Sequence, residues 1–319
     1  MLTAPLSDSV DAMLPDLRRL YEDLHAHPEL SFAEHRTAGV LADRLRILGY
    51  DITSGVGRTG VVATLDNGAG PTVMLRADMD ALPVREDTGL PYASTVTARE
   101  EDGAEVPVAH ACGHDMHVTG LIGVATALAA HRSAWAGRVI LVLQPAEEIG
   151  AGASAMLADR LFERFGTPTI ALGQHLAPAP AGSLLYRPGV VMSASDALRI
   201  VLHGRGAHGS APEQSVDPVV MAASTVMRLQ TVVSRDIAAT DAAVVTVGTL
   251  HAGTKENIIP DRAELTCSIR TFDPAVRERV LAAIARIVRG EAQGAGAPQE
   301  PDITPMYSFP AVRARDEIT

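Results

Sequence analysis

Residues of the types that bind transition metals are concentrated in four short segments of this sequence. They are residues 78–83 (DMDALP), 111–115 (ACGHD), 144–148 (QPAEE) and 173–175 (GQH). Three of the segments directly follow short apolar runs, and the other precedes a long apolar run. Thiol, imidazole and carboxylate groups in combination indicate zinc or a similar divalent transition metal.

The spacing within two of these segments indicates what the metal would do. Cys112 and His114 are two residues apart, so in an extended segment both side chains project to one side and can reach one metal site. The neighbouring Glu147 and Glu148 point in different directions, so one can bind metal while the other faces a water molecule. A metal hydrolase needs a metal that lowers the pKa of its bound water to about 7 and a nearby carboxylate that accepts the proton.

The apolar runs predict the elements that must position these residues. Runs at residues 61–65, 72–77, 139–143 and 169–172 are too short for helices and predict buried strands of one sheet. Residues 115–131 predict a buried crossover helix, and amphipathic stripes at residues 14–24 and 38–48 predict two earlier helices. The order predicts an α/β domain with a mostly parallel sheet, in which ligands bind beyond the carboxyl ends of the strands.

From about residue 187 the pattern becomes that of a smaller α+β module. Residues 197–202, 243–250 and 263–270 predict strands, and residues 217–234 and 274–289 predict helices that begin at Asp-Pro pairs. Alternating apolar and polar residues in the third strand indicate a sheet with one face open to water. Residues 290–301 are rich in Gly, Ala, Gln, Glu and Pro and predict a linker.

Composition excludes several classes of protein. The length of 319 residues, with 47% hydrophobic and 20% charged residues, favours two globular domains over a fibrous or disordered chain. A net charge of -11 repels phosphate backbones and anionic membranes, so we expect neither nucleic acid nor a membrane as partner. We see no secretory signal, and the two cysteines fit a reducing compartment, so the expected location is the cytoplasm.

Five motifs in this order resemble those of the metallo-aminoacylase and carboxypeptidase superfamily. They are residues 76–83 (RADMDALP), 112–117 (CGHDMH), 144–148 (QPAEE), 206–208 (GAH) and 255–260 (KENIIP). The match is to the amidohydrolase branch, which includes hippurate hydrolases, indoleacetyl-amino-acid hydrolases and N-acyl-amino-acid deacetylases. The resemblance runs from about residue 25 to about residue 310. It implies a zinc-peptidase-like catalytic domain at residues 1–186 and an inserted lid and dimerisation domain at residues 187–298.

The resemblance also implies a metal centre and a catalytic base. Two divalent ions are expected, with zinc as the first choice and manganese, cobalt or nickel as alternatives. Their implied ligands are Cys112, His114, Glu148 and His175. Glu147 is the implied general base. Asp80 and Asp115 are implied to hold the ligands in place from behind.

Substrate contacts are implied for the lid domain. His208 is expected to polarise the scissile carbonyl, and Asn257 to hold the substrate carboxylate, with Arg270 as a further candidate for that carboxylate. The implied reaction splits an N-acyl amino acid into a carboxylic acid and a free amino acid, in a homodimer formed through the lid domain. Six other histidines are given no metal-binding or catalytic role: His25, His27, His117, His131, His203 and His251.

The sequence departs from the family pattern near its end. Family members return from the lid to the catalytic domain through a long stretch that carries a Gly-Ser-Glu-Asp-Phe type motif and a last histidine ligand. Nothing after Phe309 matches that stretch, and His251 is the last histidine. Residues 299–319 are therefore expected to be an incomplete return segment. The alternative to an active amidohydrolase is a metal-binding or dimerising fragment with impaired catalysis, which lacks that last ligand.

Overall fold

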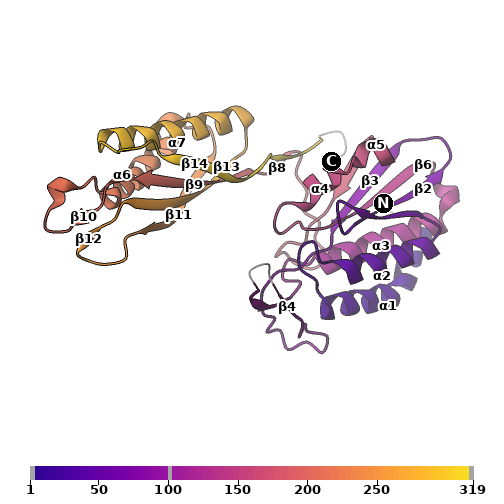
Figure 1. The fold of residues 1–319 in the computed structure, drawn as a ribbon. Coiled ribbons are helices and arrows are strands. Elements are labelled where there is room, and N and C mark those ends of the chain that lie inside the picture. Colours follow the sequence, from indigo (N-terminus) through magenta and orange to yellow (C-terminus); the bar gives the residue numbers. More distant parts are fainter. Residues whose placement is uncertain (1–3, 100–102, 316–319) are drawn as a thin grey trace. The chain divides into compact units, whose positions relative to one another are not determined.

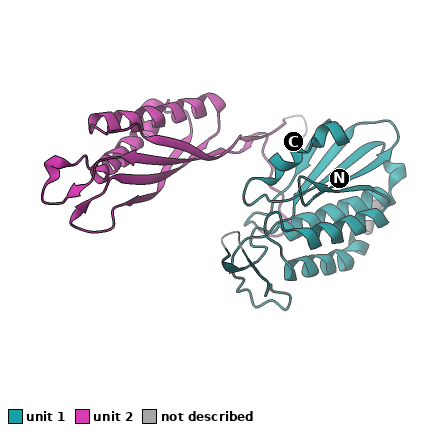
Figure 2. Cartoon of the chain, viewed as in Figure 1, with its two compact units in different colours: residues 1–179 teal, residues 180–319 magenta. Residues whose placement is uncertain are grey.

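The chain divides into two compact units, Met1–Ala179 and Pro180–Thr319 (Figure 2). The computed structural model describes residues 4–99 and 103–315. Each unit has a hydrophobic core of its own, because the buried side chains cluster within one unit or the other. The predicted domain boundary after residue 186 lies close to the observed division.

A five-stranded sheet with the order β1-β2-β6-β3-β7 is the centre of the first unit (Figure 1). Its strands are β1 (Asp51–Val56), β2 (Gly60–Asn67), β3 (Thr72–Asp78), β6 (Gly137–Gln144) and β7 (Ile170–Gly173). β3 pairs in parallel with both β6 and β7, whereas β2 is antiparallel to β1 and to β6. The sheet is therefore mixed rather than mostly parallel. The turn after β1 is short, so it can join β1 to β2 only as an antiparallel hairpin. The sequence analysis did not predict β1 because its polar residues form no apolar run.

Helices cover both faces of this sheet, as Figure 1 shows. On one face lie α1 (Ala4–Ala26), α2 (His35–Ile47) and α3 (His114–Ala130), and on the other lie α4 (Gly152–Ala158) and α5 (Leu161–Phe165). Val61 and Ala63 of β2 pack toward the first group and Val62 toward the second, because successive strand residues face opposite sides. α3 is the predicted crossover helix between β3 and β6. β4 (Thr97–Arg99) and β5 (Glu105–Pro107) form a small hairpin, and η1 (Arg132–Ala134) follows α3.

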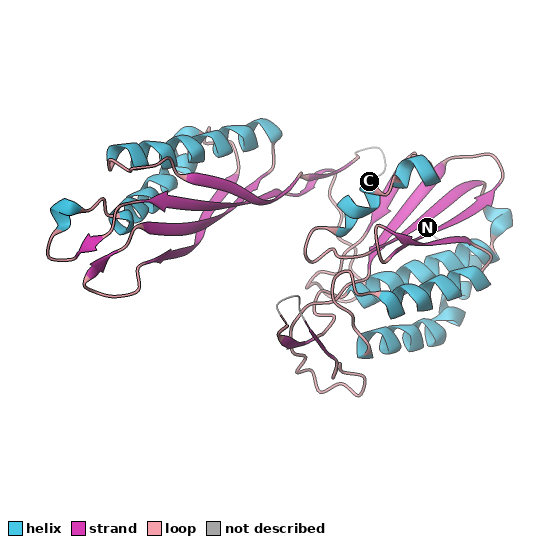
Figure 3. Ribbon diagram, in the orientation of Figure 1, coloured by secondary structure: helices cyan, strands magenta, loops and turns pink. Residues whose placement is uncertain are grey.

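The second unit is a four-stranded antiparallel sheet, order β11-β13-β9-β14, with two helices on one face (Figure 3). Its strands are β9 (Ala194–His203), β11 (Ala243–Ala252), β13 (Arg262–Thr271) and β14 (Asp302–Phe309). The helices are α6 (Pro218–Thr231), extended by a π-helical turn η3 (Val232–Asp236), and α7 (Pro274–Gly294). Asp217 and Asp273 cap α6 and α7 by accepting backbone N–H groups, as the Asp-Pro pairs predict. Every second residue of β13 is buried, so one sheet face packs on the helices and the other stays open.

Short elements complete the second unit. β8 (Gly189–Met192) pairs with β15 (Val312–Ala314), β10 (Ala207–His208) pairs with β12 (Ile258–Ile259), and η2 (Pro212–Gln214) follows β10. Within the described ranges, no helix is long and apolar enough to cross a membrane.

Two expectations for the last part of the chain differ from the structure. α7 continues to Gly294 because Ala292 extends its buried stripe, so the predicted linker from residue 290 begins later. Residues 302–309, assigned to a return segment, form β14 and pair with β9 in the second unit. Tyr307 and Phe309 stack there, and the pairing of this mostly exposed segment with β9 could not be seen without the partner strand.

Candidate active site

The predicted metal-binding segments of the first unit meet at the carboxyl ends of strands β3, β6 and β7. Asp78, the last residue of β3, pairs with Gln144, the last residue of β6, and Arg76 pairs with Gly173 at the end of β7. The loops that follow the three strands therefore start side by side, and the N-terminus of α3 lies with them. Three groups of side chains place their ligand atoms within 4.8 Å of one another: Cys112, His114 and His175; His114, Glu147 and Glu148; and Asp78, His114 and His117.

His114 belongs to all three groups and has one ring nitrogen free for a ligand. Its Nδ1 lies 2.8 Å from the backbone oxygen of Asp80, and because a carbonyl can only accept, Nδ1 carries the proton. The lone pair is then on Nε2, which is buried and has no hydrogen-bond partner among the described residues. Nε2 lies 3.7 Å from Glu148 Oε1 and 3.9 Å from Glu147 Oε2. These two carboxylates and the unprotonated nitrogen face one point, and this arrangement suits a bound cation.

Cys112 and His175 face each other beside His114. Cys112 Sγ lies 3.3 Å from His175 Nε2, and His175 Nδ1 donates to the backbone oxygen of Leu176 at 2.7 Å, which leaves its Nε2 as acceptor. Burial and the charge of Glu148 raise the pKa of the Cys112 thiol to about 12. A bound cation would reverse this effect, since metal coordination favours the thiolate.

Gly113 explains the close approach of this loop. Its φ of 82° is in the left-handed region, where the residue caps the N-terminus of α3. A Cβ atom there would lie 2.7 Å from Leu176 Cδ1, so a larger residue would push away the segment that carries His175.

Asp80 connects three parts of the site from behind. Its Oδ2 accepts from the Ser31 hydroxyl at 2.7 Å and from the Glu148 amide at 3.0 Å, and its Oδ1 lies 3.3 Å from His114 Nδ1. Burial opposes ionisation of Asp80, but these donors outweigh it and lower its pKa. Burial likewise opposes protonation of His114, yet its acidic neighbours raise the pKa of the imidazole. Glu148 Oε1 is also buried without a hydrogen-bond partner, so this oxygen and His114 Nε2 are two unpartnered atoms beside the place that suits a cation.

Asp115 was predicted to hold the ligands, but its hydrogen bonds go elsewhere. Its carboxylate accepts from the Met116 amide at 2.8 Å and lies 2.6 Å from His25 Nδ1. His25 Nε2 lies 3.1 Å from a second carboxylate, that of Glu86. Burial opposes protonation of His25, but the two carboxylates outweigh it and raise its pKa. Asp115 thus ties the start of α3 to the end of α1.

His117 is a site residue that the sequence analysis left without a role. Its Nδ1 lies 2.7 Å from Asp78 Oδ1, and its Nε2 accepts from the Leu176 amide at 2.9 Å. Both ring nitrogens are therefore occupied, and His117 supports the segment of His175 instead of offering a ligand atom. Arg76 donates to Asp78 Oδ2 at 2.7 Å, and with His117 it lowers the pKa of Asp78 against the effect of burial. The spacing of three residues from His114 on one helix face was the available signal.

The predicted substrate residues lie in the second unit, where two of the three come together. β10 pairs with β12 so that His208 is opposite Ile258, and the Gly209 amide donates to the Asn257 backbone oxygen at 2.9 Å. The Ser210 amide donates to His208 Nδ1, which places the ring proton on Nε2. Arg262, at the start of β13, lines the same cavity as His208. Arg270 lies eight residues further on, about 26 Å along the strand. The structure therefore does not bring Arg270 to His208 and Asn257.

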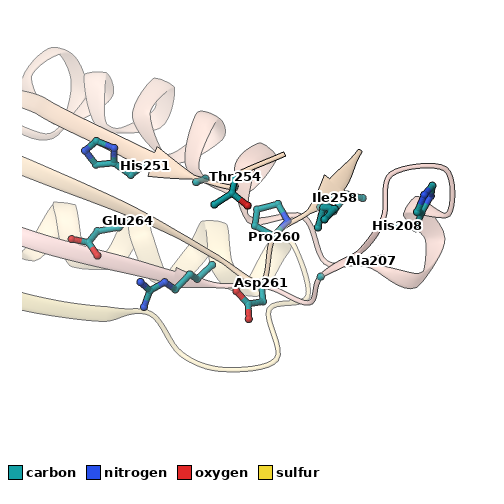
Figure 4. Close-up of a pocket in the computed structure, with 13 residues that line it drawn as sticks. Ala207, His208, His251, Thr254, Ile258, Pro260, Asp261 and Glu264 are labelled. Atoms are coloured by element: carbon teal, nitrogen blue, oxygen red, sulfur yellow. The ribbon is translucent and has the colours of Figure 1, made fainter. Parts of the chain in front are cut away.

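An open cavity of about 770 Å³ lies beside His208. In Figure 4, His251 and Glu264 lie on neighbouring strands, and Asp261 lies between this pair and His208. Arg199 donates to both carboxylate oxygens of Glu264, at 2.7 and 2.6 Å. Glu264 is therefore already paired, and His208 is one of the residues that line the cavity.

Comparison with known proteins decides the family. The model of Peptidase family M20/M25/M40 matches residues 74–308, which is most of the chain. The chain belongs to this M20 family. It is 40% identical over 280 residues to the hippurate hydrolase of Campylobacter jejuni, covering 87% of this chain and 70% of that protein. It is 39% identical over 291 residues to the N-acetylcysteine deacetylase of Bacillus subtilis, covering 89% and 72%.

Solved structures agree with this assignment. A Staphylococcus aureus structure superposes with a TM-score of 0.88 at 30% identity, over 100% of this chain and 79% of that one. The Bacillus subtilis YXEP protein, a dinuclear metal-binding peptidase of the M20 family, superposes with a TM-score of 0.79 at 33% identity, over 96% and 77%. The predicted family, the α/β fold class and the assignment as a metal-dependent amidohydrolase are confirmed.

Replacing His117 by Phe tests its supporting role. An aromatic ring is kept, but Asp78 Oδ1 and the Leu176 amide lose their partner, and Asp78 is fully buried. We expect the free energy of unfolding in urea to fall by about 1–3 kcal/mol, the cost of a buried group left unpaired. Met116→Leu, on an exposed position of the same helix, is the control and should change it little. Equal stability of H117F and wild type would contradict the role.

Proposed function

We propose that this M20 enzyme hydrolyses the amide bond of N-acyl amino acids to a carboxylic acid and a free amino acid. One observation carries the proposal: His114 Nε2 and Glu148 Oε1, both buried without partners, lie 3.7 Å apart beside Cys112, His175 and Glu147. The similarity to a hippurate hydrolase and to an N-acetylcysteine deacetylase supports a hippurate-like, N-acetyl or indoleacetyl amino acid as substrate. A cytoplasmic location and the lack of nucleic-acid and membrane partners stay predictions.

Four side chains would hold two divalent metal ions: Cys112, His114, Glu148 and His175. Their sulfur, nitrogen and oxygen donors favour zinc, with manganese, cobalt or nickel as alternatives. The dinuclear metal site of the similar YXEP protein supports a pair of ions. When bound, the ions supply a more acidic water molecule and a polarised substrate carbonyl.

Glu147 would move the proton in this reaction. Its side chain is 39% exposed, so a water molecule can reach it, and its Oε2 lies 3.9 Å from His114 Nε2. As the water oxygen bonds to the acyl carbon, Glu147 accepts the water proton. It then donates that proton to the amide nitrogen, and the C–N bond breaks to release a neutral amine. Asp80 and the Leu176 carbonyl keep the two imidazoles oriented meanwhile.

The second unit would supply the contacts to substrate. His208 carries its proton on Nε2, so it can donate to the carbonyl oxygen as negative charge develops there. The Asn257 side-chain amide is proposed to donate to the substrate carboxylate. Arg270 lies too far along β13 to contact the same carboxylate within one chain, so it has no role in this scheme.

We also propose that the second unit forms a homodimer. Large apolar side chains remain exposed on α6 and on β11, an edge strand of its sheet: Val219, Val220 and Met227, and Val244 and Leu250. Exposed apolar side chains next to an unpaired sheet edge are typical of an interface between subunits.

Replacing Glu147 by Gln tests the base. The amide keeps the shape but cannot accept the proton, so kcat should fall by about two to four orders of magnitude. Bound metal, measured by elemental analysis, should be unchanged because Glu148 is intact. Glu163→Gln, an exposed glutamate of α5, is the matched control. A wild-type rate for E147Q on hippurate, N-acetyl and indoleacetyl amino acids would refute the assignment.

The metal centre is tested by stoichiometry. We expect two divalent ions per chain in protein saturated with zinc, and Cys112→Ser should lose at least one of them because a hydroxyl binds zinc much more weakly than a thiolate does. Chelation should abolish hydrolysis, and added zinc, manganese, cobalt or nickel should restore it. Cys267→Ala, at the buried cysteine of the second core, should keep both ions. Metal-free protein that hydrolyses substrate at full rate would exclude the mechanism.

Light scattering tests the dimer. At micromolar concentration we expect a mass of about twice 33.5 kDa, and Val220→Glu should shift it toward the monomer because a charge cannot be buried unpaired in the interface. Ile47→Glu places the same charge on an exposed apolar position of the first unit and should leave the mass unchanged. A monomeric wild-type protein at this concentration would rule the dimer out.

A further inference from the structure

Glu34 is a fully buried carboxylate outside the set of residues discussed above. It precedes α2, and its side chain points away from water. Burying a carboxylate is costly unless hydrogen bonds compensate it. Burial raises the pKa of Glu34, and the hydrogen bonds it accepts oppose that rise. The identity of its donors therefore shows what this residue is for.

The donors to Glu34 come from three places, two of which are distant in the sequence. Its Oε1 accepts from the Ala146 amide at 2.7 Å and from the Phe32 amide at 3.0 Å. Its Oε2 accepts from the Thr59 hydroxyl, which lies in the turn between β1 and β2. The contact to Ala146 spans 112 residues and reaches the amide of the residue that immediately precedes Glu147 and Glu148.

Ala146 has a backbone conformation that must be held from outside. Its φ is 46°, in the left-handed region that non-glycine residues adopt only where the surroundings enforce it. Its carbonyl accepts from the amides of Ala151 and Gly152, at 3.1 and 3.0 Å. Gly152 packs so tightly that a Cβ atom there would lie 1.5 Å from the Pro145 oxygen. The turn is thus fixed on its carbonyl side by Ala151 and Gly152 and on its N–H side by Glu34.

We propose that Glu34 is a positioning residue for the hydrolysis. By holding the Ala146 amide it keeps this residue left-handed, and so sets the direction in which Glu147 and Glu148 leave the end of β6. The inference rests on the proposed function, because its effect on turnover requires Glu147 to be the base. A displacement of about 1 Å at a reacting group can cost about 100-fold in rate, so a distant hydrogen bond of this kind can control kcat.

Three variants of Glu34 separate positioning from folding. Glu34→Met keeps the length but accepts no hydrogen bond, and Glu34→Asp keeps the charge but is one methylene too short for Ala146. Both should lower kcat by about 10- to 100-fold, with KM within about threefold, in metal-saturated protein. Glu34→Gln still has an oxygen for the Ala146 and Phe32 amides, and should keep kcat within about threefold. Wild-type kcat in E34D, or an E34Q as slow as E34D, would overturn the proposal even if E34M failed to fold.

A control removes the other half of the Glu34 contacts. Thr59→Val deletes the donor to Oε2 but leaves the bond to Ala146, so it should lower the melting temperature without lowering kcat. A fall in kcat as large as that of E34D would mean that the effect is general loss of structure, and would count against positioning.

Coupling to Glu147 gives the decisive measurement. If Glu34 acts through the base, Glu34→Asp should slow the wild type but add little to Glu147→Gln, so the two effects are not additive. Additive effects would overturn the positioning role. The proposed function is judged separately: a wild-type rate in E147Q refutes it, whereas a slow E147Q beside an unimpaired E34D refutes only the role of Glu34.

Discussion

The parallel pairing of β3 with both β6 and β7 is the constraint on which the site depends. The register places Asp78 beside Gln144 and Arg76 beside Gly173, so the carboxyl ends of the three strands lie side by side. Arg76 reinforces the alignment by donating to the Gln144 side chain at 2.9 Å. A slip of one residue would turn every side chain of a strand to the opposite face, and the loops with Asp80, Glu148 and His175 would no longer meet.

The site is acidic, and its charges are only partly balanced by protein groups. Four carboxylates surround His114, those of Asp78, Asp80, Glu147 and Glu148, while Arg76 is the nearby arginine that pairs with Asp78. Buried charges without partners are unfavourable, so this cluster is best satisfied when cations bind. The acceptor carbonyls of Asp80 and Leu176 prepare it for them, because they direct the lone pairs of His114 and His175 into the site.

The types of the site residues could be predicted from the sequence, but their supporting contacts could not. Cys112, His114, Glu147 and Glu148 stand out because their spacing and chemistry are local. The role of His117 depends on Asp78, 39 residues away, and that of Glu34 depends on Ala146, so both require the fold. β1 was missed because it is polar and half exposed, and β14 because its pairing with β9 is what defines it.

The net charge of the whole chain implies that the metal ions would also help to attract the substrate. An N-acyl amino acid carries a carboxylate, and the protein has a net charge of -11, so their long-range interaction is repulsive. Divalent ions among Cys112, His114, Glu148 and His175 would change the sign of the local field where the substrate must enter. In this scheme His208 and Asn257 orient the substrate by donating hydrogen bonds to it. Under the proposed function, binding of the anionic substrate would therefore depend on the same ions as its hydrolysis, and this would explain how an acidic cluster can serve an acidic substrate.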